Sequence, residues 1–207
     1  MISYILSIIV VFVSSVVNGF PDRFIKEKQE QENHYPYKLY KREEWGALPA
    51  VGVVPLNTPV PYVVIHHTYI PAACNTTEMC KNSMKSMQNY HNSLGWGDIG
   101  YNFCIGSEAG VYEGRGWENK GIHAGRANGV SVGICLIGDW RTELPPQSQL
   151  EATKALIKTG IKEGYIRPDY KLVGHKQVMA TECPGGALYQ HISTWDHFVP
   201  EFVEMKH

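Results

Sequence analysis

Two histidines and one cysteine lie far apart in the chain at positions where their side chains could hold a metal ion. His66 follows the apolar run "YVVI", His175 ends "KLVGH", and Cys183 lies in "TECPGG". Two imidazoles and one thiolate can bind Zn²⁺ tetrahedrally and leave the fourth position open to water. The spacing alone is also compatible with two histidines at the edge of the core and a buried thiol.

Cys183 has other chemical interpretations. It could be a disulfide partner, a buried thiol, or a nucleophile with His66 or His175 as its base. The nucleophile is disfavoured because Cys183 precedes Pro184 and Gly185 and is not expected to begin a helix.

Apolar runs and turn residues predict the elements that would position these side chains. All three candidate ligands lie where buried strands are expected to give way to loops, and sites in α/β proteins form where strands end. Strands alternating with helices predict an α/β domain with a central mixed β-sheet flanked by helices. The expected strands cover residues 60–68, a hairpin in 98–116, 130–140 and 170–175; the expected helices cover 75–95, 147–163 and 186–199.

Composition limits the class of protein. The 207 residues are 43% hydrophobic and carry a formal net charge of −1, which suits one globular domain and favours neither nucleic acid nor an anionic membrane as partner. Residues 1–19 are uncharged and end in small residues, which predicts a secretory signal peptide. An uncleaved membrane anchor is the alternative interpretation, because no basic residue precedes the apolar stretch. Residues 20–38 have the composition of a polar linker, and residues 39–207 form the expected domain. We therefore expect a secreted, extracellular protein without membrane contact after signal cleavage.

A series of motifs from about Tyr40 onward resembles the peptidoglycan recognition proteins of animal innate immunity. That family is similar to the zinc amidases of bacteriophage lysozyme type. The resemblance implies a protein that binds bacterial peptidoglycan or muropeptides, and we expect it to be a monomer. The motifs that carry it occur in the same order as in the family: "YVVIHHT", "GWGDIGYNFCIG", "VYEGRGW", "GIHAG", "SVGICLIGDW", "LVGHKQV" and "TECPGGALY".

The resemblance implies an enzyme, an N-acetylmuramoyl-L-alanine amidase with Zn²⁺ as its cofactor. The metal ligands would be His66, His175 and Cys183, and the remaining catalytic positions match Tyr101 and Thr181. Members that only bind peptidoglycan usually lack the cysteine or the tyrosine, so a purely recognising module is the rival interpretation.

The resemblance also implies a substrate groove. In the family, a Gly-Trp pair and an arginine accompany selectivity for meso-diaminopimelic acid, whereas Asn-Phe accompanies lysine. The corresponding residues here are Gly95, Trp96 and Arg115. His91 and His123 lie in the other segments that would form the groove.

The remaining cysteines and one asparagine have structural interpretations. The family has a disulfide at the spacing of Cys74 and Cys80, and Asn75 begins a glycosylation sequon. Cys104 and Cys135 lie in apolar strands and are expected to be buried. His67 should point to the opposite face of its strand from His66 and is not expected to be a ligand.

Overall fold

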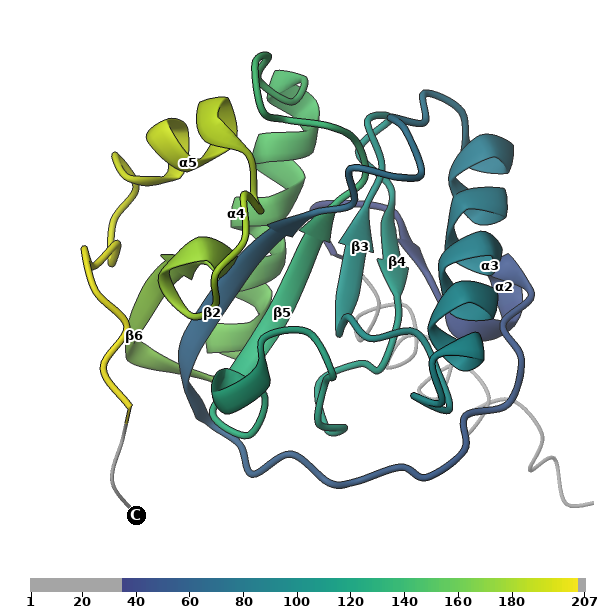
Figure 1. The fold of residues 1–207 in the computed structure, drawn as a ribbon, viewed down its shortest axis with the longest axis horizontal. Coiled ribbons are helices and arrows are strands. Elements are labelled where there is room, and N and C mark those ends of the chain that lie inside the picture. Colours follow the sequence, from purple (N-terminus) through teal and green to yellow (C-terminus); the bar gives the residue numbers. More distant parts are fainter. Residues whose placement is uncertain (1–34, 205–207) are drawn as a thin grey trace, which may run out of the picture. The chain divides into compact units, whose positions relative to one another are not determined.

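A six-stranded mixed β-sheet organises the domain in the computed structural model, which describes residues 35–204. The strand order is β1-β4-β3-β5-β2-β6 (Figure 1). β4 runs antiparallel to β3, and the other neighbouring strands pair in parallel. This confirms the predicted fold class. The strands are β1 (Leu39–Tyr40), β2 (Val60–His67), β3 (Phe103–Ile105), β4 (Val111–Glu113), β5 (Ser131–Leu136) and β6 (Ile166–Gly174).

The β2 strand, which carries His66, lies between β5 and the edge strand β6. Its β-branched residues are buried on both faces, as a parallel strand covered on both sides requires. His66 is paired with Cys135 of β5, and His67 is paired with Leu136. Alternation along the strand therefore separates the two histidines onto opposite faces, as expected.

Helices cover the two faces unequally. α4 (Gln147–Lys162) packs its apolar side on β3, β5 and β6 and lies behind the sheet in Figure 1. α3 (Thr77–Ser93) covers the β3–β4 part of the other face together with the short α2 (Arg42–Trp45). α3 therefore packs on β3 and β4 and does not cover the face of β2 that carries His66. This leaves space for a functional site beside His66.

Local hydrogen bonds explain where α3 begins and where the last helix ends. The Thr76 side chain accepts from the backbone N–H of Met79 and caps the start of α3. α5 (Gly186–Ile192) is shorter than the expected 186–199. The helix ends at Ile192 because the hydroxyls of Ser193 and Thr194 donate to the carbonyls of Gln190 and His191.

The last strand is longer than the sequence predicted. β6 begins at Ile166, four residues before the expected start at residue 170, and contains Pro168. β6 is the edge strand of the sheet, where a proline leaves no neighbouring strand without a donor. The two short elements β1 and α2 were not expected, because they contain too few residues for a periodic pattern.

The cysteine expectations inside residues 35–204 are confirmed. Cys74 and Cys80 form a disulfide, and Cys104 and Cys135 are free and buried. The predicted signal peptide and most of the predicted linker lie outside the described residues. Among the helices of residues 35–204, none has the length and apolar character needed to cross a membrane.

Candidate metal centre and groove

His66, His175 and Cys183 come together from three separate segments. His66 is near the end of β2, His175 begins the 3₁₀ turn η2 (His175–Gln177) directly after β6, and Cys183 lies in the loop before α5. One ligand atom from each of the three lies within 4.8 Å of the other two. The His66 Nδ1 atom is 3.7 Å from Cys183 Sγ, and the rings of His66 and His175 are 4.5 Å apart.

The donor atoms of this trio fit a zinc ion. Burial and the neighbouring histidines hold the pKa of His66 well below its ordinary value, and burial lowers the pKa of His175 to about 4. Both imidazoles are therefore neutral, as ligands must be. The buried Nε2 atom of His175 has no hydrogen-bond partner in residues 35–204. Burial raises the pKa of the Cys183 thiol to about 12, and a bound cation would reverse that shift.

Backbone groups hold Cys183 in place. The backbone N–H of His67 donates to Cys183 Sγ at 3.3 Å, a contact that stabilises negative charge on the sulfur. The Cys183 carbonyl accepts from the Lys176 N–H at 2.7 Å, which ties the loop to η2. The side chain of His67 is turned away and accepts from the Trp140 N–H at 3.2 Å.

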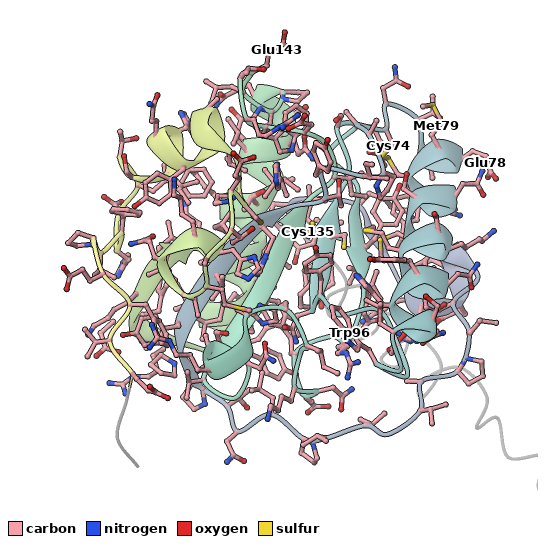
Figure 2. All side chains as sticks on the ribbon, in the orientation of Figure 1. Cys74, Glu78, Met79, Trp96, Cys135 and Glu143 are labelled. Atoms are coloured by element: carbon pink, nitrogen blue, oxygen red, sulfur yellow. A yellow bond between two sulfur atoms is a disulfide. The ribbon has the colours of Figure 1, made fainter. Side chains whose placement is uncertain are left out.

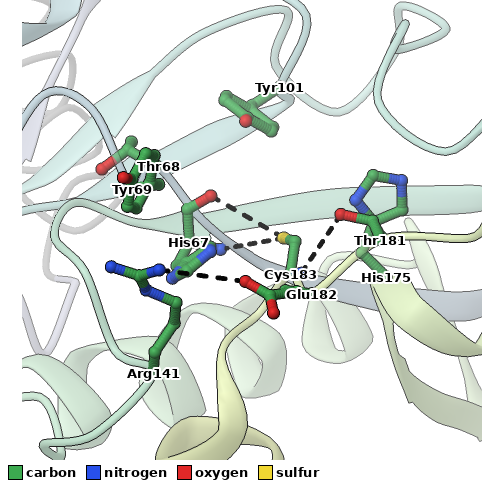
Figure 3. A pocket seen from close by; sticks show the side chains of 9 residues that line it. All are labelled: His67, Thr68, Tyr69, Tyr101, Arg141, His175, Thr181, Glu182 and Cys183. Carbon is green, nitrogen blue, oxygen red and sulfur yellow. Dashed lines mark hydrogen bonds and ion pairs between the residues drawn. The ribbon is translucent and has the colours of Figure 1, made fainter.

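A cavity of about 520 Å³ opens beside the trio. Figure 3 shows Tyr101 at the top and Arg141 at the lower left, with Cys183 near the centre and His175 beside Thr181 at the right. The cavity is lined by His67, Thr68, Tyr69, Tyr101, Arg141, His175, Thr181, Glu182 and Cys183.

Tyr101 is placed to act as a hydrogen-bond donor in this cavity. Its ring centre is 5.2 Å from that of His66. Burial of the phenol holds its pKa well above the ordinary value, so the hydroxyl keeps its proton at neutral pH. The Thr181 Oγ1 atom also lines the cavity and accepts from the Cys183 backbone N–H at 3.2 Å. Its own hydroxyl proton remains available to a ligand.

Aromatic rings continue from Tyr101 to the end of α3. The edge of Tyr101 meets the ring of His91 at 5.7 Å, and His91 stacks on Trp96 at 4.6 Å. Figure 2 labels Trp96 at the C-terminal end of α3. Gly95 has a φ of 79°, which favours glycine, and a Cβ atom there would meet no other atom within 4 Å. The space beside Gly95 and Trp96 is therefore open.

Arg115 fixes the backbone of the Trp96 loop. Only 6% of the residue is exposed, and it donates to the carbonyls of Ile99 at 2.8 Å, Trp96 at 2.9 Å and Lys120 at 3.3 Å. These contacts show that Arg115 is not a solvated surface charge.

His123 occupies a different place from the other predicted groove residues. Only 7% of it is exposed, and its Nδ1 atom is 2.9 Å from the Nε2 atom of His66. It therefore lies in contact with a candidate ligand, and the predicted contact with substrate stays a prediction.

Two buried polar residues near Tyr101 in the chain were not singled out from the sequence. Asp98 accepts from Arg42, from the Gln88 side chain and from the Ile99 N–H. Asn102 donates to the carbonyls of Gly116 and Asn119 and accepts from the Gly133 N–H. The motif "DIGYNF" offered a signal, because polar residues flank Tyr101 in an otherwise apolar segment.

Comparisons with known proteins agree on one group of proteins. The sequence pattern of the family described as "N-acetylmuramoyl-L-alanine amidase" matches residues 56–186. Peptidoglycan-recognition protein LB of Drosophila melanogaster is 52% identical over 162 residues, which cover 78% of this chain and 70% of that protein. The N-acetylmuramoyl-L-alanine amidase of Mus musculus is 41% identical over 164 residues, which cover 77% of this chain but only 31% of that relative.

Solved structures resemble the fold closely. Drosophila PGRP-LB aligns with a TM-score of 0.77, covering 78% of this chain and 96% of that one. A variant of PGRP-LB in complex with tracheal cytotoxin aligns equally well. PGRP-LE in complex with tracheal cytotoxin, described as monomeric diaminopimelic acid-type peptidoglycan, is 39% identical over 78% of this chain and 95% of its own, with a TM-score of 0.76.

Proposed function

Because the chain belongs to the peptidoglycan-recognition proteins of the N-acetylmuramoyl-L-alanine amidase family, we propose that it is a secreted zinc-dependent amidase of innate immunity. The proposed reaction is hydrolysis of the amide bond between muramic acid and the L-alanine of the peptidoglycan stem peptide. The relatives named as amidases and the relatives solved with tracheal cytotoxin support both the reaction and the substrate.

One observation carries the proposal. His66, His175 and Cys183 bring their ligand atoms within 4.8 Å of one another, and two of them, His175 and Cys183, line the same cavity as Tyr101. A module that only binds peptidoglycan would not require neutral imidazoles and a thiol to converge beside a protonated phenol.

The residues of the chain would perform distinct parts of the hydrolysis. Bound zinc would activate a water molecule and polarise the scissile carbonyl. The Tyr101 hydroxyl would donate a hydrogen bond to the oxygen on which negative charge develops. Thr181 would donate its free hydroxyl proton to the substrate or the attacking water from the other side of Cys183.

The stem peptide would lie along the aromatic row from Tyr101 to Trp96. His91 and Trp96 present a wall to the aliphatic part of the third stem residue, and the open space at Gly95 leaves room for it. Arg115 would bind the extra carboxylate that distinguishes diaminopimelic acid from lysine.

The direct test uses the purified full chain and a muropeptide with a diaminopimelic stem peptide. Metal content is measured first, and release of free stem peptide is then followed by chromatography and mass spectrometry. We expect stoichiometric zinc, loss of release after chelation and recovery after zinc is restored. Binding of the muropeptide without release, at full zinc occupancy, would assign the chain to the purely recognising members.

The proposed location and state of the protein have separate tests. N-terminal sequencing of the protein exported from eukaryotic cells should begin at Phe20 if residues 1–19 are a signal peptide. Asn75 is exposed next to the disulfide and is open to glycosylation, which a mass shift on deglycosylation would reveal. Sedimentation should give the mass of a monomer.

A further inference from the structure

A buried histidine contacts the candidate ligand His66 on the side away from Cys183. His66 Nδ1 faces Cys183 Sγ at 3.7 Å, whereas its Nε2 atom lies 2.9 Å from His123 Nδ1. The two rings are nearly perpendicular, with an interplanar angle of 89°. Each nitrogen of His66 therefore has its own neighbour.

This arrangement fixes where the protons must lie when His66 binds a metal through Nδ1. A neutral imidazole carries one N–H, so the proton of His66 would have to be on Nε2. The hydrogen-bond partner of that Nε2 atom in residues 35–204 is His123 Nδ1, which must then accept. The proton of His123 consequently lies on its own Nε2 atom.

Hydrogen bonds to the backbone and the absence of side chains at two glycines fix the position of the His123 ring. The Asn128 side chain accepts from the backbone N–H groups of His123 at 2.9 Å and of Ala124 at 2.7 Å. A Cβ atom at Gly133 would lie 2.5 Å from the His123 ring carbon Cγ, and a Cβ atom at Gly121 would also clash with the ring. Two glycines thus leave the space that the imidazole fills.

The other ring nitrogen argues against a purely structural role. His123 Nε2 is buried and has no hydrogen-bond partner in the described part of the chain. An apolar side chain of similar size would fill the same space without an unsatisfied donor. Within residues 35–204, the contact with His66 is the one polar interaction of the His123 imidazole. That contact therefore explains why position 123 holds a histidine and not an apolar residue.

We propose that His123 is a positioning residue that holds the His66 ring in the tautomer and orientation needed to bind zinc through Nδ1. This inference rests on the proposed zinc-dependent function. Partners of this kind orient a ligand, and their loss typically weakens metal binding about 10- to 100-fold.

The test compares three variants in the full chain. His123→Leu fills the space without an acceptor, whereas His123→Asn places an amide oxygen close to the position of Nδ1. His191→Asn removes a histidine from α5 and serves as the matched control. Zinc affinity is measured by competition with a chromophoric chelator, and cobalt absorption spectra report the geometry of the site independently of activity.

We expect His123→Leu to bind zinc about 10- to 100-fold more weakly and to show an altered cobalt spectrum. His123→Asn should recover most of the affinity and the spectrum, and His191→Asn should match the unmodified chain. Equal affinity of His123→Leu and the unmodified chain would overturn the inference. So would an equal loss in the folded His123→Leu and His123→Asn proteins. An unmodified chain that binds no zinc would instead contradict the proposed function.

A second measurement needs no variant and applies if His123→Leu does not fold. Nitrogen-15 NMR of the zinc-loaded chain distinguishes the ring nitrogens that carry protons. We expect the protons of His66 and His123 both on Nε2. A His123 protonated on Nδ1 could not accept from His66 and would refute the proposal.

Discussion

The Nδ1 atom of His66 lies 3.7 Å from the Sγ atom of Cys183, although 117 positions separate the two residues in the chain. Their contact depends on the loop before α5, which the His67 N–H holds against the end of β2 and the Lys176 N–H ties to η2. The groove residues His91, Gly95 and Trp96 belong to other segments. The proposed metal binding and the proposed substrate binding should therefore be separable by mutation.

Cys183→Ser should separate them. A neutral hydroxyl is a poor zinc ligand, so zinc content should fall and kcat should drop about 100-fold or more. Affinity for a muropeptide should change little, because the serine fills nearly the same space. Metal analysis, stem-peptide release and calorimetric binding on one preparation measure all three quantities. Undiminished turnover in Cys183→Ser would refute the ligand assignment.

Tyr101→Phe should retain zinc and lose turnover. The substitution preserves the ring that contacts His66 and His91 and deletes the hydroxyl. If that hydroxyl stabilises the developing negative charge, kcat should fall about 100-fold or more with KM little changed. Steady-state kinetics at full zinc occupancy provide the measurement, and an unchanged kcat would leave Tyr101 a structural residue.

The sequence predicted that three side chains meet but not what surrounds them. The family resemblance named His66, His175 and Cys183 as candidate ligands, and the structure brings their ligand atoms together. The role of His123 was out of reach, because its contact with His66 spans 57 positions. That contact also needs the space that Gly133 leaves on the neighbouring strand.

Arg115 illustrates a second limit of sequence reasoning. A motif can place an arginine in a groove, but it cannot show how many of its donors are already used. Here the carbonyls of Ile99, Trp96 and Lys120 accept from Arg115, contacts that depend on how three loop segments approach one another. Such contacts between loops leave no periodic pattern in the sequence.

His91 should make the metal-free protein sensitive to acid. Burial and the nearby Arg115 charge lower the pKa of His91 to about 4, compared with 6.5 for the ordinary side chain. As pH falls from 6.5 to 4, the unfolded chain gains a proton here that the folded chain does not. This residue therefore contributes no pH dependence above 6.5 and lowers stability below it, by up to about 1.4 kcal/mol per pH unit.

His91→Asn tests this dependence. The amide oxygen can accept from the Gly100 N–H, as His91 Nδ1 does, but it does not titrate. Urea unfolding in the presence of a chelator should give a smaller loss of stability between pH 6.5 and 4 in the variant. Between pH 7 and 8 the difference between the two proteins should stay constant, which is the internal control. Parallel stability curves below pH 6 would show that His91 does not titrate in this way.

Selectivity for diaminopimelic-type peptidoglycan should depend on Arg115 and on the Gly95-Trp96 pair. The guanidinium has five N–H groups. Nε, Nη1 and Nη2 each donate to one backbone carbonyl, which leaves two N–H groups for a ligand carboxylate. A charge-assisted pair of this kind contributes about 1.5–3 kcal/mol, or about 10- to 150-fold in affinity. Arg115→Ala should remove that preference for the diaminopimelic form over the lysine form.

The ratio of the two affinities is the quantity to measure, because Arg115 also holds the Trp96 carbonyl. Loosening this loop would weaken the binding of both muropeptides together, whereas loss of a carboxylate contact weakens only the binding of the diaminopimelic one.

A Gly95→Asn, Trp96→Phe double variant provides the complementary change, since asparagine tolerates the positive φ of residue 95. It should shift the preference toward lysine while Arg115 stays in place. Calorimetry in the Cys183→Ser background prevents turnover during the titration. An unchanged affinity ratio in both variants would show that these three residues do not recognise the third stem residue, even if the chain is an amidase.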